Sequence, residues 1–199
     1  MLDPMSAVVR PALATFADLA KLGDDARVEI VGGAIVDKAA PTMEHGRSQT
    51  ALGGYLGRRY DRRPGGRWPG GWWIGTEVDV EYGAHELYRH DLVGWRRDRV
   101  PECPSGRPIR VRPDWVCEIL SPSNERRDLV DKLRTLHGAG VPHYWILNPE
   151  EKILLVHRHQ ADGYLVALTA SSDDTVRAEP FGDVELRVGV LFGDLDDDE

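Results

Sequence analysis

The stretch from Arg112 to Lys132, RPDWVCEILSPSNERRDLVDK, constrains this chain more than any other. It begins as a short apolar run containing two acids, Asp114 and Glu118, and passes through a turn into a charged, helix-like segment. An unpaired carboxylate held away from water costs on the order of several kcal/mol. Glu118, whose neighbours are apolar on both sides, therefore requires a partner elsewhere in the chain.

The size and composition of the chain are those of an ordinary globular protein. It has 199 residues, of which 41% are hydrophobic and 29% charged, and we expect one domain over residues 1–199. We place its core at about residues 27–158, a strand extension at 159–192 and an acidic tail at 193–199. The sequence has no apolar run long enough to cross a membrane and no signal-peptide pattern. Cys103 and Cys117 form no CxxC pair, which favours a reduced, cytoplasmic protein.

The charge distribution leaves two interpretations open. The net charge of −8 argues against a protein held to nucleic acid by bulk charge. Arginines nevertheless cluster at positions 58, 59, 62, 63 and 67, and again at 89, 96, 97, 99, 107, 110 and 112. These clusters are either solvated faces or a local basic surface suited to phosphate. Only four basic residues are lysines, so a lysine in an unusual environment is easy to notice.

Hydrophobic periodicity and turn residues predict a mixture of helices and strands. We expect helices at residues 15–22, 42–62 and 124–138, and strands at 27–31, 34–38, 72–82, 87–95, 114–120, 143–147, 152–159 and 163–169. Residues 96–112 form a loop rich in Pro, Gly and Arg, and residues 175–192 carry weaker strand signals. The strand at 114–120 is nearly continuously apolar, which indicates a central position covered on both faces.

Two charged side chains fall on the predicted inward faces of helices. Glu44 aligns with Ser48 and Leu52 at helical spacing, although an acid in a first turn also favours the helix dipole. Lys132 shares a face with Leu129 and Leu136, and there it either extends to the surface or meets buried acids.

Several kinds of catalytic or metal site find no support. The sequence contains no GxxxxGK[ST], GxGxxG or GxSxG motif. His157 and His159 point the same way on a predicted strand, but no Cys or acid lies nearby at zinc-ligand spacing. We therefore assign the pair to a surface hairpin rather than to a zinc site.

The remaining charged residues explain one another if they share a pocket. These residues are Glu44, Asp91, Glu118 and Lys132. Three adjacent carboxylates cannot all ionise without a cation, and oxygen ligands favour Mg²⁺ or Mn²⁺. Such an ion activates water and polarises a phosphoryl oxygen, while a lysine stabilises developing charge. The set is suited to phosphodiester hydrolysis.

The same residues resemble a known family. The pieces are VEIVGGAIVDKAAPTMEHG, YRHDLVGW, RPDWVCEILSPSNERRDLVDKL and AGVPHYWILNPEEKILLVHR, which span about residues 27–158. Their order is similar to that of the PD-(D/E)XK restriction-endonuclease-like superfamily and, more closely, to that of the bacterial Uma-type endonucleases. The combination of PDxxxEILSPS with a following RRDxxxK helix is far more specific than any single acid.

This resemblance implies a fold and a site. The fold is an α/β restriction-endonuclease-like mixed sheet flanked by helices, here with an additional N-terminal hairpin and C-terminal strands. The resemblance makes Asp91 and Glu118 metal ligands, Glu44 an added helix carboxylate and Lys132 the catalytic lysine. His90 replaces the usual Pro, and Leu120 stands where the usual pattern has Lys, which Lys132 supplies from the helix. Asp114, near the start of the strand, we treat either as structural or as a residue that supports the metal ligands.

The expected function is a metal-dependent endonuclease acting on DNA. Two alternatives remain: a non-catalytic member of the fold that binds nucleic acid or a protein, and a metal-dependent hydrolase of another phosphoester. A homodimer would place the arginine clusters of two copies around one DNA groove. His45, next to Glu44, is a weaker candidate for a substrate contact.

Overall fold

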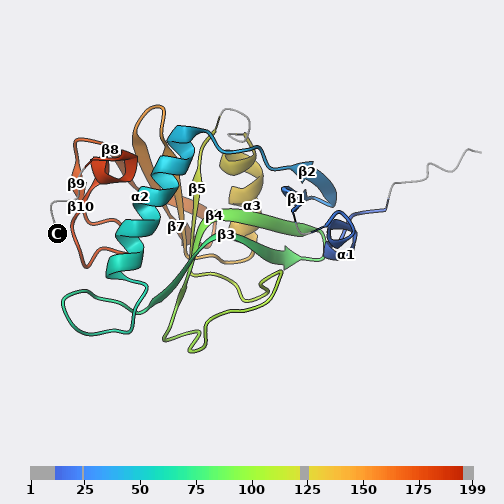
Figure 1. Cartoon of the computed structure of the whole chain (residues 1–199), viewed down its shortest axis with the longest axis horizontal. Coiled ribbons are helices and arrows are strands. Elements are labelled where there is room, and N and C mark those ends of the chain that lie inside the picture. Colours follow the sequence, from blue (N-terminus) through green and yellow to red (C-terminus); the bar gives the residue numbers. More distant parts are fainter. Residues whose placement is uncertain (1–11, 24, 122–125, 195–199) are drawn as a thin grey trace, which may run out of the picture.

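A computed structural model describes residues 12–23, 25–121 and 126–194. Within these ranges the chain forms an eight-stranded sheet with helices on both faces (Figure 1). The strands of this sheet are β1 (Val28–Val31), β2 (Ala34–Asp37), β3 (Trp72–Gly83), β4 (Glu86–Arg96), β5 (Trp115–Ile119), β6 (His143–Asn148), β7 (Ile153–Gln160) and β8 (Gly163–Ser171). The helices are α1 (Phe16–Ala20), α2 (Met43–Arg59), the π-helix η1 (Arg127–Lys132), α3 (Leu133–Gly138) and the 3₁₀-helix η2 (Val188–Phe192).

The sheet is mixed, as the sequence predicts. Its order is β2-β1-β4-β5-β6-β7-β8, and β3 pairs with β4. Only the β5–β6 pair of the described strands is parallel. The β6–β7–β8 meander confirms the three predicted strands. All five residues of β5 are buried, which confirms its predicted central position.

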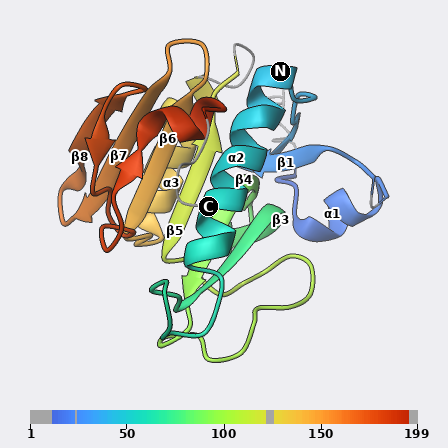
Figure 2. The ribbon, with the colours of Figure 1, turned by 60° about the vertical axis from the view of Figure 1, so that its left-hand side comes forward.

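Two hydrophobic clusters cover the two faces of the sheet. On one face, Leu52 and Leu56 of α2 pack with Cys117 and Ile119 of β5. On the opposite face, Leu136 of α3 packs in a cluster with Val116 and other strand residues. Figure 2 shows α2 lying across the sheet, with α3 behind it. The carboxyl end of β5 therefore lies between the two helical layers.

The N-terminal hairpin adds β1 and β2 beside β4. Gly32 and Gly33 have φ values of 56° and 78°, and this left-handed conformation is what a two-residue hairpin turn requires. Ile30 of β1 pairs with Leu87 of β4. The hairpin is thereby joined to the strand that carries Asp91.

Helix α2 buries a different first-turn residue from the one predicted. Its buried side chains include His45, Ser48 and Leu52, whereas Glu44 is exposed. Both positions lie one turn before Ser48, so periodicity does not distinguish them. Glu44 instead accepts hydrogen bonds from its own backbone N–H and from Thr42, which lower its pKa. The expectation that Glu44 faces inward is wrong, and its position agrees with the first-turn alternative.

The predicted helix at residues 124–138 is partly of another type. Its expected cap, Asn124, lies outside the described residues, as do most of the leader and of the acidic tail. Residues Arg127–Lys132 form a π-helix before α3 begins.

At residues 175–192 the expected strands are only β9 (Thr175–Val176) and β10 (Leu186–Arg187), followed by η2. No helix in the described part of the chain is long and apolar enough to cross a membrane.

Candidate active site

Asp91 and Glu118 lie on adjacent antiparallel strands. The β4–β5 register pairs Leu92 with Cys117, so the residues that precede Leu92 and follow Cys117 are neighbours. The backbone N–H of Ile119 donates to Asp91 Oδ2 at 2.8 Å. The predicted neighbouring strands are therefore present, with both acids near the carboxyl end of β5.

A local irregularity in the sheet lies opposite Asp91. Glu77 of β3 has a φ of 54°, and the register passes from Thr76–Leu92 to Val78–His90. On β3, Ile74 packs on the α2 side while Val78 packs on the α3 side. The alternation is thus reversed at Glu77. On β4, Asp91 lies on the α2 side like its neighbour Leu92, and His90 lies beside Glu118.

Three partners hold the Asp91 carboxylate, and a fourth holds its backbone carbonyl. The ammonium of Lys38 is 2.7 Å from Oδ1. His45 Nε2, from α2, donates to Oδ2 at 3.1 Å, alongside the Ile119 amide. Gln49, one turn further along α2, donates to the backbone carbonyl of Asp91 at 3.0 Å. Both carboxylate oxygens of Asp91 therefore have partners.

Glu118 has two partners on the α3 side of the sheet. His90 Nδ1 donates to Oε1 at 2.5 Å, and Lys132 Nζ is 2.9 Å from Oε2. Tyr82 donates its hydroxyl proton to His90 Nε2 at 2.7 Å. Burial lowers the pKa of His90 well below its usual value, so His90 is a neutral donor to the carboxylate.

Lys132 is buried among acids rather than extended to the surface. Its side chain is 2% exposed, and Nζ lies 3.1 Å from Glu29 Oε1 and 3.2 Å from Asp128 Oδ1 in addition to Glu118. The π-helical turn places Asp128 four residues before Lys132 on the same side. Arg127 contacts the second oxygen of Glu29 at 3.0 Å. The structure confirms the second interpretation of Lys132, in which the side chain meets buried acids.

The site holds more acids than its buried cations can keep ionised. Burial raises the pKa of Glu118 to about 8 and that of Asp128 to about 7, against the opposing effect of Lys132. Burial also acts on Asp91, but its hydrogen bond with His45 and the charge of Lys38 keep its pKa below the usual value. Glu29 likewise keeps a lowered pKa through Lys132 and Lys38, despite its burial. An additional positive charge at the site would therefore stabilise the ionised forms of Glu118 and Asp128.

Asp91 and Glu118 are the residues best placed to hold a divalent ion. Among the described residues, no three His, Cys, Asp or Glu side chains converge as a ready-made metal site. Mg²⁺, however, is commonly held by one or two carboxylates and completes its shell with water and substrate phosphate. Asp91 is held on the α2 side and Glu118 on the α3 side, so the chemistry of each carboxylate suits the expected ion, and joint binding by the two is a proposal.

Glu44 lines a pocket next to this cluster instead of joining it. The pocket has a volume of about 500 Å³ and is bounded by the start of α2, the end of β5 and the β6–β7 turn. Its lining residues are Thr42, Glu44, Leu120, Ser121, Asn148, Pro149, Glu150 and Glu151. Three glutamates, Glu44, Glu150 and Glu151, therefore line this pocket.

Charged residues of the cluster that were missed from the sequence include Glu29, Lys38 and Asp128. Glu29 lies within the apolar run VEIV, the same anomaly that identifies Glu118. Lys38 is one of only four lysines, and its rarity is the signal that could have identified it. Asp114 is structural, as expected, since it binds Arg99 at 2.7 Å and the Arg96 amide at 2.8 Å.

The histidines of β7 make hydrogen bonds to backbone carbonyls. His157 Nδ1 lies 3.2 Å from the Tyr144 carbonyl oxygen, and His159 Nε2 lies 3.1 Å from that of His137. His157 is buried rather than on a surface hairpin.

Comparison with known protein families identifies the family of this chain. Residues 13–189 match the Uma2 family, which is described as "Putative restriction endonuclease". The chain belongs to the Uma2 family. This membership confirms the resemblance seen in the sequence.

A solved structure supports the fold independently. A "putative nuclease belonging to DUF820" from Anabaena variabilis is similar with a TM-score of 0.71 at 20% identity, over 90% of this chain and 97% of that chain. The restriction-endonuclease-like architecture of this Uma2 member is thus confirmed. Comparison with curated proteins gave no match.

Proposed function

We propose that this Uma2 protein is a divalent-metal-dependent endonuclease that hydrolyses phosphodiester bonds in DNA. The observation that carries the proposal is the contact of Lys132 Nζ with Glu118 Oε2 at 2.9 Å, beside Asp91 on the adjacent strand. The family description and the fold support a nuclease. Metal dependence and DNA as substrate are the further parts of the proposal.

Asp91 and Glu118 would hold the ion, either Mg²⁺ or Mn²⁺. When bound, such an ion polarises a phosphoryl oxygen and lowers the pKa of a coordinated water. Hydrogen bonds from His45 and the Ile119 amide fix the orientation of Asp91. The neutral His90 does the same for Glu118. The carboxylates are therefore oriented before the substrate arrives.

Lys132 would stabilise the negative charge that develops on the phosphate during attack. Its three acidic neighbours raise its pKa well above the usual value, although burial alone would lower it. Lys132 is therefore a permanent cation rather than a proton donor. Glu29 and Asp128 hold it in place next to Glu118.

The decisive test is cleavage of plasmid and single-stranded DNA with Mg²⁺ or Mn²⁺. Wild type should cleave, whereas Glu118→Gln should lose activity by about 10²-fold or more. Asp162→Asn is a matched control, because Asp162 is exposed in the β7–β8 turn, away from the carboxyl end of β5. Equal cleavage by wild type and Glu118→Gln, or none with either metal, would refute the proposal.

A non-catalytic binding role is the second candidate. The observation in its favour is that ion pairs and hydrogen bonds already occupy both oxygens of Asp91 and of Glu118. DNA binding that is insensitive to metal, with no cleavage, would support this role. Cleavage of a small phosphodiester but not of DNA would instead indicate another phosphoester substrate. The homodimer stays a prediction, which light scattering tests directly.

A further inference from the structure

We propose that Lys38 is a positioning residue that competes with the divalent ion for Asp91. Its ammonium lies where an ion bound to Asp91 Oδ1 has to lie, so that metal binding requires Lys38 to move away. The inference rests on the proposed function in one respect, since it takes Asp91 as a metal ligand.

The position of Lys38 is well defined by its contacts. Nζ lies 2.7 Å from Asp91 Oδ1, 2.6 Å from the backbone oxygen of Arg89 and 3.6 Å from Glu77 Oε1. An ammonium has three protons to donate, and three oxygens surround this one. The side chain is 3% exposed. Lys38 is therefore part of the buried cluster rather than a surface residue that happens to lie near it.

Asp91 has little room for a second cation. Its Oδ2 already accepts hydrogen bonds from the Ile119 amide and from His45 Nε2. An ion would therefore have to bind Oδ1, and Lys38 already contacts this oxygen. A Mg²⁺ ion lies about 2.0–2.1 Å from its oxygen ligands. At that distance it would repel the ammonium strongly in so buried a site.

Glu77 is the carboxylate to which Lys38 can move. It is 31% exposed, and it already attracts both Lys38 and Arg27. Its φ of 54° marks the irregularity in β3 opposite Asp91. Rotation of the lysine side chain toward Glu77 keeps the ammonium paired while it frees Oδ1. Displacement of Lys38 from Asp91 thus reduces the net free energy gained on metal binding, and pairing with Glu77 makes this displacement less costly.

The first test is calorimetric titration of metal-free protein with Mn²⁺. Lys38→Met keeps the length of the side chain without its charge, and it should bind Mn²⁺ at least about tenfold more tightly than wild type. Lys21→Met is the control, because Lys21 is 73% exposed and pairs only with Asp18 among the described residues. Unchanged or weaker binding by Lys38→Met, or no binding by either protein, would overturn the proposal.

The role of Glu77 gives an effect of opposite sign. Glu77→Gln should weaken Mn²⁺ binding in wild type, but it should have little effect when Lys38 is already methionine. Such non-additivity is expected only if the two residues act together. An equal loss of affinity in both backgrounds would mean that Glu77 acts on the ion directly, and the exchange of Lys38 between carboxylates would be wrong.

A second measurement uses the wild-type protein, in case Lys38→Met fails to fold. Reductive methylation followed by mass spectrometry should leave Lys38 unmodified in metal-free protein and modify it at saturating Mn²⁺. The exposed residues Lys21 and Lys152 should react equally in both states. Continued protection of Lys38 at saturating Mn²⁺ would overturn the proposal. Neither readout depends on cleavage, so an absence of nuclease activity would refute the proposed function alone.

Discussion

Two regions of one sheet bury carboxylates and pair them in different ways. At the candidate site, Asp91 and Glu118 are paired with buried lysines and histidines. Elsewhere in the sheet, Asp79 binds Arg89 through two hydrogen bonds of 2.8 and 3.1 Å and Arg107 through one of 2.5 Å. The arginine partners of Asp79 are partly exposed, whereas Lys38 and Lys132 are not.

The kind of cation paired with each carboxylate distinguishes Asp79, which we expect to stabilise the fold, from Glu118, which we expect to act in catalysis. Burial would raise the pKa of Asp79, but its hydrogen bonds with the two arginines lower it instead. Planar guanidinium groups match a carboxylate geometrically and remain charged. Asp79 thus fastens the loop that contains Arg107 to the sheet. Glu118, by contrast, has a pKa raised to about 8 by burial, so it holds a proton at neutral pH in the metal-free protein.

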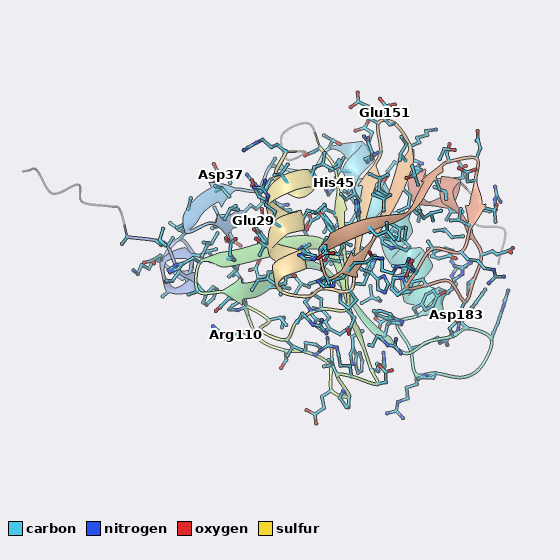
Figure 3. All side chains as sticks on the ribbon, turned by 180° about the vertical axis from the view of Figure 1, so that it is seen from behind. Glu29, Asp37, His45, Arg110, Glu151 and Asp183 are labelled. Carbon is cyan, nitrogen blue, oxygen red and sulfur yellow. The ribbon has the colours of Figure 1, made fainter. Side chains whose placement is uncertain are left out.

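The distribution of exposed charge adds a second contrast. Glu44, Glu150 and Glu151 surround the pocket beside the site, whereas Arg110 belongs to the arginine-rich loop. Figure 3 shows Glu151 at the upper edge of the molecule and Arg110 at its lower edge. The acidic pocket and this arginine of the loop therefore lie apart in a single copy. The homodimer, in which one copy would supply basic surface to the other, stays a prediction.

The largest effect should follow replacement of Lys132. Lys132→Met leaves three acids without their shared cation, which should lower the free energy of unfolding by about 3–5 kcal/mol. It should also reduce DNA cleavage by about 10³-fold, because charge on the phosphate is no longer stabilised. Urea unfolding and plasmid cleavage measure the two effects. Lys152→Met, which removes an exposed lysine, should change neither; full cleavage by folded Lys132→Met would contradict the assignment.

Replacement of Asp79 should affect stability alone. Asp79→Asn weakens charge-assisted hydrogen bonds to Arg89 and Arg107, and we expect a loss of about 2–3 kcal/mol in unfolding free energy. Cleavage at a temperature where the variant is folded should stay within about twofold of wild type. A loss of cleavage as large as that of Glu118→Gln would show that the two regions are not functionally separate.

The two regions should also respond to pH in opposite directions when metal is absent. The folded state holds an extra proton on Glu118 between its ordinary pKa of 4.5 and about 8. Stability should therefore fall as pH rises through this window, by roughly 1 kcal/mol per pH unit, and Asp128 contributes in the same direction. The lowered pKa of Asp79 gives stability that is present above pH 3.8 and lost as pH falls further.

Thermal unfolding in a chelator from pH 3 to 9 measures both slopes. Glu118→Gln should reduce the loss at higher pH, and Asp79→Asn should reduce the loss at low pH. A wild-type stability that is constant between pH 5 and 8 would contradict the raised pKa of Glu118.

Sequence patterns predicted the framework better than the contacts within the site. The strands themselves and the inward face of Lys132 follow from apolar periodicity, which reports burial directly. The partner of each charge depends on local details that periodicity does not contain. The irregularity at Glu77, where His90 rather than Asp91 lies beside Glu118, is one such detail. The Asp128–Lys132 pair, by contrast, has the four-residue spacing that brings side chains together on a helix.

Glu29 and Lys38 show the limit of reasoning from motifs. Both lie in the N-terminal hairpin, far in sequence from β5, and only the pairing of β1 with β4 brings them to the site. The criterion that identified Glu118, an acid inside an apolar strand, applies equally to Glu29 in VEIV. Applied to every strand, this criterion would have found the second acid that holds Lys132.

The smallest effect should come from Glu44, which the sequence placed among the metal ligands. The structure leaves it exposed in the first turn of α2, while His45 contacts Asp91. Glu44→Gln should therefore keep cleavage within about twofold and lower the melting temperature only slightly, through a weaker interaction with the helix dipole. His45→Ala is the informative comparison, because it removes a hydrogen bond that orients Asp91 and should reduce cleavage by at least about tenfold. If Glu44→Gln instead reduced Mn²⁺ affinity and cleavage together, Glu44 would have to turn inward when the ion binds, and the acidic pocket would be part of the metal site.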